Sequence, residues 1–310
     1  MSAVVWAVPV ILVVSALLCS VASTAFVFRR IKSTNDPVRS AASWLKTCWV
    51  ILTVVWLPLS LAVHCLNLDI QMSGKPADTH ARAMGFLRPL KNLVGFITTA
   101  YILMLQLDLV LGLKRVAGSQ SAQVDDATAI KEEKRDSRKR IGAWVALIVT
   151  LALALAQGVL TQMGSRAQWM QIQHRSDSLT GCALQITVAV LLLCGVVTVL
   201  VYGIVVSRAA MGPVGRVMGM QLTVASLLGV VRQVCMLVYA CLVMTGLLHY
   251  DEEPALDILE SITTIWTVIG GLWLTAAVLA RREGGLWSVH IKSCDTPVPG
   301  DEDLEAVRYA

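Results

Sequence analysis

Charged residues are scarce in this chain of 310 residues, and the sequence motifs of several enzyme classes are missing. Only 15% of the residues are charged, whereas 56% are apolar and the mean hydropathy is +0.67. The sequence contains no HExxH zinc-protease motif, no GxSxG nucleophile elbow and no glycine-rich phosphate loop. Common hydrolytic and nucleotide-dependent chemistries therefore have no support in the sequence.

The short alternating segments of outer-membrane barrels are also missing, and long apolar runs take their place. Such runs recur along the whole chain, and about 20 apolar residues are needed to cross a hydrocarbon core roughly 30 Å thick. Barrel strands would instead alternate over segments of about 10 residues. We therefore expect an all-α membrane protein that forms a seven-transmembrane helix bundle.

The apolar runs predict a transmembrane domain over residues 1–282 and a short polar tail over residues 283–310. The predicted spans cover residues 3–28, 47–68, 90–113, 141–163, 181–206, 217–247 and 256–280. No basic segment precedes the first run, which is longer than the apolar part of a typical signal peptide, so we expect a helix that is retained. The tight turn with Gly212, Pro213 and Gly215 makes the fifth and sixth spans antiparallel neighbours.

Lysine and arginine are distributed unequally between the two sides of these spans. One side, with residues 29–46, the loop 114–140, the turn after the fifth span and the tail, carries 19 of them, and the other side carries six. Because basic loops stay in the cytoplasm, we expect the N-terminus outside and the C-terminus in the cytoplasm. The plasma membrane is the favoured location, with an internal membrane as the alternative.

The loop 114–140 is the most charged part of the chain and contains the run DDATAIKEEKRDSRKR. We expect a short solvated helix with a basic end, which is either a plain solvated loop or a docking element for a cytoplasmic partner. Because the basic residues lie beside apolar spans, the net charge of +5 does not indicate a nucleic-acid partner. The lipid bilayer is the expected surrounding, and no cofactor is implied.

Ionisable side chains inside the spans are few, and each is a candidate functional residue because inserting one costs about 2.5–3.5 kcal/mol. Asp108 lies in the third span and Arg232 near the middle of the sixth. One hypothesis is that the two face each other as an intramembrane charge pair that acts as a conformational latch. The alternative is that Arg232 bonds to glutamines or carbonyl groups while Asp108 reaches the interface near Lys114 and Arg115.

Polar residues towards the outer ends of the spans are candidates for a pocket that opens between helices. These residues are His64, Tyr101, Gln162, Gln185 and Glu260. The alternative is that their side chains only reach interfacial water.

Three of the eight cysteines are candidates for covalent modification. Cys65 and Cys182 fall at predicted outer helix ends, where an oxidising compartment permits a disulfide. Cys294 follows the amphipathic segment RREGGLWSVHIKS and is a candidate for lipidation on a helix that lies along the membrane. We expect most of the others to be small buried residues, and no metal site is indicated.

Seven spans, an outside N-terminus, a basic second inner loop and a proline in the second span resemble a G-protein-coupled receptor in outline. The motifs depart from those of rhodopsin-like receptors, since Gly112, Leu113, Lys114 and Arg115 stand where Asp-Arg-Tyr would. The stretch 267–276 has no Asn-Pro-x-x-Tyr, and the seventh span has no lysine for a retinal Schiff base. The resemblance implies a topology and does not establish G-protein coupling.

Three classes of function fit this topology. The first is a receptor-like heptahelical protein of unassigned ligand, in which the third and sixth spans move apart at the inner face. The second is a small transporter or lipid translocator, although the first three spans do not visibly match the last three as an internal repeat would. The third is a membrane-embedded enzyme on an apolar substrate, which would need Asp108 or Glu260 in a shared cavity.

Overall fold

The computed structural model describes residues 3–31, 39–73, 78–119, 126–168, 174–209, 213–244 and 258–280. Apart from Ile31, all of these residues are helical. The elements in chain order are α1 (Ala3–Arg30), α2 (Arg39–Val50), η1 (Ile51–Trp56), α3 (Leu57–Ser73), α4 (Asp78–Ser119), α5 (Asp126–Gln168), α6 (His174–Ala209), α7 (Pro213–Met244), η2 (Ser261–Trp266) and α9 (Thr267–Ala280). The predicted tail 283–310, with Cys294, lies outside the described residues.

Seven apolar helical stretches lie within the described residues. They are 21 to 32 residues long and apolar enough to cross a membrane, which requires about 20 residues. This finding confirms the prediction of an all-α protein with seven membrane-crossing helices. The chain is therefore an integral, multi-pass membrane protein whose helices are embedded in a lipid bilayer.

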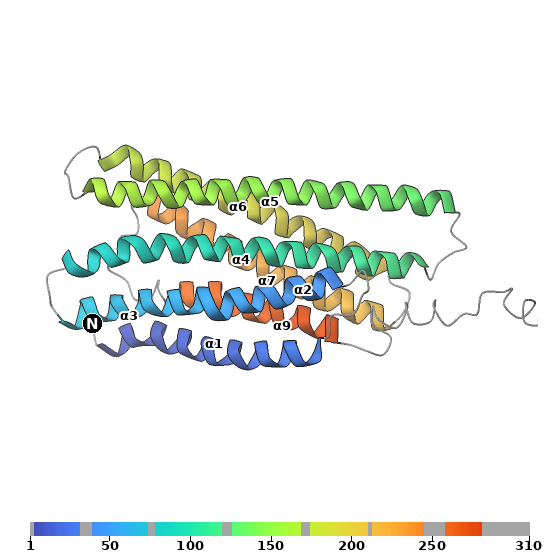
Figure 1. Ribbon diagram of the computed structural model, residues 1–310, viewed down its shortest axis with the longest axis horizontal. Coiled ribbons are helices and arrows are strands. Elements are labelled where there is room, and N and C mark those ends of the chain that lie inside the picture. The colour runs from blue at the N-terminus through green and yellow to red at the C-terminus, as the bar shows by residue number, and fades with distance from the viewer. Residues whose placement is uncertain are drawn as a thin grey trace, which may run out of the picture.

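Consecutive spans run in alternate directions through one bundle (Figure 1). We call the end of the bundle where α1 begins the N-terminal face, and the end where α9 terminates the C-terminal face. The spans of α4 and of residues 258–280 are the most enclosed, with 61% and 56% of their apolar windows buried against 17–39% in the other five. Helix α4 contacts α2, α3, α5, α6 and α7, so its side chains can join the second, fourth, fifth and sixth spans.

Two helices are much longer than a membrane is thick. Helix α4 has 42 residues and α5 has 43, which gives each a length of about 64 Å. Both project beyond the other helices at the C-terminal face (Figure 1). The prediction of a separate short helix in the loop 114–140 is wrong. Helix α4 continues into this loop up to Ser119, and the charged residues from Asp126 onward form the first turns of α5.

Two π-helical turns interrupt otherwise regular spans. The rod formed by α2, η1 and α3 widens over Ile51–Trp56, where the Leu57 N–H donates to the Leu52 carbonyl five residues earlier. Pro58 follows directly and has no N–H to donate, so the wider turn accommodates the proline without a break in the rod. The second π-helical turn, η2, lies near the start of the last span. Both turns lie beside the polar residues described below.

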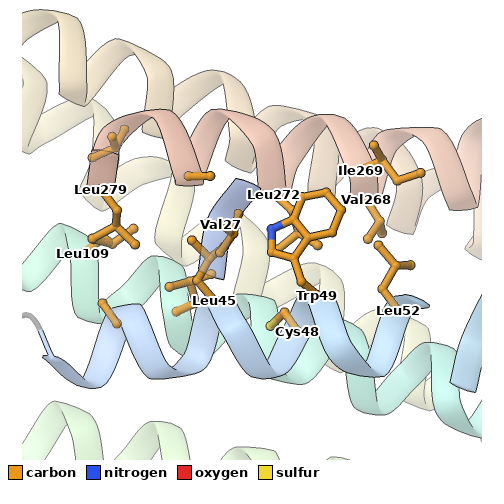
Figure 2. Close-up of a cluster of buried hydrophobic side chains, with 14 of the residues drawn as sticks. Val27, Leu45, Cys48, Trp49, Leu52, Leu109, Val268, Ile269, Leu272 and Leu279 are labelled. Carbon is orange, nitrogen blue, oxygen red and sulfur yellow. The ribbon is translucent and has the colours of Figure 1, made fainter. Parts of the chain in front are cut away.

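The largest apolar core lies between α1, α2, α4 and α9. Trp49 is fully buried in this core, with Leu45, Leu52 and Leu272 around it (Figure 2). Because Trp49 is enclosed on every side, it belongs to the core and not to an aromatic belt at the membrane interface. The packing of this core determines the position of α9 against the second span.

Helices α6 and α7 approach closely near the C-terminal face. A Cβ atom added at Gly219 would lie 2.5 Å from Cβ of Ser207 and 2.7 Å from its Cα, so only glycine fits the backbone separation found here. The two helices pack along their length, as expected from the short turn between them.

Candidate functional site

Arg232 occupies the middle of the bundle, where its side chain is only 4% exposed. Its Nη1 donates to the hydroxyl of Thr99, and its Nη2 donates to the carbonyl of Gly95 at 3.4 Å. The Thr99 hydroxyl in turn donates to the same Gly95 carbonyl at 2.8 Å. The guanidinium also lies over the ring of Trp56, 5.2 Å from its centroid. Arg232 on α7 is thus held by α4 and by the π-helical turn of the second span.

The backbone of α4 is suited to these contacts at Gly95. A Cβ atom here would make ordinary van der Waals contact with the Trp56 indole at 3.4–3.5 Å, so the ring packs directly against α4 at this position. Threonine hydroxyls commonly bond to the carbonyl four residues earlier in a helix, which orients the Thr99 oxygen. Its remaining lone pair then accepts the bond from Arg232.

The charge of Arg232 is stabilised mainly by neutral groups. Among the described residues, no carboxylate lies within ion-pair distance of its guanidinium, and Glu260 attracts it through space. Glu260 instead forms an ion pair with Lys91, with 2.7 Å between Nζ and Oε1 and side-chain exposures of 9% for Lys91 and 20% for Glu260. Two buried cations therefore share the negative charge of Glu260.

A second polar contact lies beside this ion pair. The Nε2 atom of His64 is 3.5 Å from the hydroxyl of Ser261, which follows Glu260 and begins η2. His64 is 3% exposed. The π-helical turn η2, which begins at Ser261, thus lies between Glu260, close to the N-terminal face, and the regular helix α9.

A small cavity adjoins Arg232 and has a volume of about 30 Å³. Its polar lining comes from Thr99, Gln106, Arg232, Gln233 and Thr267, and the remaining walls are apolar side chains and glycines. Among the described residues, Nε of Arg232 and Oε1 of Gln233 have no hydrogen-bond partner. A space of this size admits two or three water-sized groups, since a water needs about 10–15 Å³ by this measure.

The predicted charge pair of Asp108 and Arg232 is not formed. Oδ1 of Asp108 lies 3.2 Å from Nε of Arg140 at the start of the fourth span. Asp108 is nine residues beyond Thr99 along α4, which places it about 14 Å nearer the C-terminal face. Arg232 instead joins the third and sixth spans through a hydroxyl and a carbonyl of α4. The carbonyl bond belongs to the alternative expected for Arg232, whereas the bond to the Thr99 hydroxyl belongs to neither expectation.

The described members of the five residues predicted for an outer pocket do not form one cluster. His64 and Glu260 are close, because Ser261 links them. Tyr101 packs edge-on against Trp44 at 5.1 Å between ring centroids, and Gln185 is buried on α6. The side chain of Gln162 lies outside the described residues.

Cys65 has an exposed free thiol on α3, which does not support the disulfide predicted with Cys182. The side chain of Cys182 and the whole of the segment around Cys294 lie outside the described residues. Lipidation at Cys294 therefore stays a prediction.

Sequence reasoning missed four residues of this site: Trp56, Lys91, Gly95 and Thr99. Lys91 lies at the very start of the predicted span 90–113, where a lysine is expected to reach interfacial water, but the apolar stretch begins at Ala83 and so places Lys91 well inside the span. Gly95 and Thr99 carry no comparable signal, since glycine and threonine are ordinary residues in membrane helices.

Comparison with models of known protein families, with curated proteins and with solved structures finds no match to this chain. The site geometry alone therefore has to support any functional proposal.

Proposed function

We propose that this seven-helix membrane protein is receptor-like, with its N-terminus outside, its C-terminus in the cytoplasm and the plasma membrane as its location. The unequal distribution of lysine and arginine supports this orientation. The observation that carries the proposal is the contact of Arg232 with Thr99 and Gly95, because it joins the third and sixth spans at mid-membrane. The ligand would bind near the N-terminal face, beside Lys91 and Glu260.

The contact is suited to a reversible switch. A hydrogen bond to a charged group contributes about 1.5–3 kcal/mol, which corresponds to roughly a 10- to 150-fold population ratio between joined and separated helices. When α7 moves away from α4, no carboxylate is left without a partner, because Thr99 and Gly95 are neutral. Ligand binding that draws Arg232 away from Thr99 could therefore shift the equilibrium between the two states.

The ends of α4 and α5 that project at the C-terminal face are the candidate docking surface for a cytoplasmic partner. The segment 114–140 contains eight basic residues and extends α4 and α5 past the other helices (Figure 1). We propose that a cytoplasmic partner docks on this projection. The ion pair of Asp108 with Arg140 lies at its base, so a shift of α4 reaches the docking segment directly.

The switch is tested by electron-spin distance measurements on the full chain in lipid nanodiscs. Encoded keto amino acids carry the labels, which leaves the native cysteines in place. One label pair replaces Lys114 and Arg216 at the C-terminal face, and the other replaces the exposed residues Phe86 and Val238 near the N-terminal face. Thr99→Val removes the acceptor of Arg232 with little change in shape.

A receptor-like switch predicts that Thr99→Val adds a longer α4–α7 distance at the C-terminal face while the N-terminal pair changes little. The alternative function of a transporter predicts opposite changes at the two faces, as alternating access requires. A single distance at both faces that Thr99→Val leaves unchanged would contradict the proposed switch.

A further inference from the structure

Positive charge exceeds negative charge in the interior near Arg232. Lys91 and Glu260 form a direct ion pair. Within the described ranges, the guanidinium of Arg232 then has neutral partners only, together with the more distant attraction of Glu260. Arg232 is 4% exposed, so water at the protein surface cannot solvate it. A buried charge is normally balanced by a direct partner of opposite sign.

The cavity beside Arg232 offers a place for such a partner. Its volume is about 30 Å³, and Arg232 and Gln233 both line it. Within the described part of the chain, Nε of Arg232 is a buried donor without an acceptor, and the Gln233 side chain, 2% exposed, has an amide atom without a partner. A glutamine amide can turn so that its NH₂ group faces an anion. Thr99 and Gln106 add polar atoms to the same wall.

We infer that this cavity binds one small monovalent anion of halide or formate size. The cavity is too small for gluconate, sulfate or an organic phosphate, because it admits only about two or three water-sized groups and each of these anions is larger than that. A water molecule could bond to Nε of Arg232, but it would leave the positive charge without a counter-ion. The anion site goes beyond the receptor-like function and does not depend on it, since binding alone tests it.

The test uses the purified full chain in detergent at neutral pH and constant ionic strength. Sodium chloride replaces sodium gluconate stepwise while thermal unfolding is followed, and chlorine NMR line widths report bound chloride directly. Because a ligand that binds only the folded state stabilises it by mass action, we expect a saturable rise in Tm of several degrees. Formate should give the same rise, and sulfate should not.

Two variants locate the site. Arg232→Gln removes the cation, and Ala225→Leu fills the cavity while every charge stays in place, since Ala225 lines the cavity. Both should abolish the chloride-dependent rise in Tm and the NMR line broadening. Asp108→Asn, near the C-terminal face, should leave both intact. If Arg232→Gln does not fold, Ala225→Leu still decides the question.

Two results would overturn the inference. Equal Tm values in chloride and gluconate, without line broadening, would mean that only water occupies the cavity. A chloride effect that persists in Ala225→Leu would place the anion elsewhere. Neither result depends on whether α4 and α7 separate, so failure of the anion site is distinguishable from failure of the proposed switch.

Discussion

Replacing Glu260 should destabilise the protein more than replacing its ion-pair partner Lys91. The two side chains are 2.7 Å apart and largely buried. Glu260→Gln leaves both Lys91 and Arg232 as buried cations without a carboxylate, and breaking a buried pair in this way costs about 3–5 kcal/mol. In Lys91→Met, by contrast, Glu260 keeps the attraction of Arg232. The loss is then nearer to one charge-assisted hydrogen bond, about 1.5–3 kcal/mol.

The assay is the free energy of unfolding in mixed micelles, measured for each variant against the unchanged protein. Asp108→Asn is the matched control, because its partner Arg140 is 38% exposed and an ion pair with an exposed member contributes only about 0–1 kcal/mol. The double variant Lys91→Met with Glu260→Gln should lose less than the sum of the single variants. The reasoning is refuted if Lys91→Met destabilises the protein as much as Glu260→Gln does.

Two packing predictions follow from the same structure. Gly219→Ala should lower Tm and separate α6 from α7, because its Cβ would lie 2.5 Å from that of Ser207. Gly142→Ala should not lower Tm, since nothing lies within 4 Å of that position and alanine is the better helix former. Thermal unfolding of the two variants checks this, and equal Tm values would contradict it. Trp49→Ala should lower the free energy of unfolding by about 3–5 kcal/mol as a buried large-to-small change. Trp273→Ala, at an exposed ring, should lower it clearly less, and an equal loss in micelle unfolding would contradict the assignment of Trp49 to the core.

The spans could be predicted from sequence because their cause is local. A hydrocarbon core of fixed thickness requires a continuous apolar run, and such runs are readable without knowing what they touch. Arg232 was identified in the same way, as a charge inside an apolar run. The π-helical turn before Pro58 also has a local cause, although proline by itself signals only some distortion of the helix.

The partners of Arg232 could not be predicted because their cause is not local. Whether α7 meets α4 at Thr99 or at Asp108 depends on the depth and rotation of the two helices. These depend in turn on distant contacts, such as the Trp56 ring beside Gly95. An argument from charge pairing favoured Asp108, but the structure pairs Asp108 with Arg140. The cavity beside Arg232 is likewise formed by α4, α6, α7 and α9 together, so no single segment indicates it.

The central claim is that Arg232 holds α7 to α4 through Thr99 and not through Asp108. Its most direct test is the coupling energy from two double-mutant cycles, Arg232→Gln with Thr99→Val and Arg232→Gln with Asp108→Asn, measured by unfolding in mixed micelles. We predict a coupling of about 1–3 kcal/mol with Thr99, since contacting residues are coupled, and under about 0.5 kcal/mol with Asp108, since distant sites are additive. A larger coupling with Asp108 than with Thr99 would contradict the account.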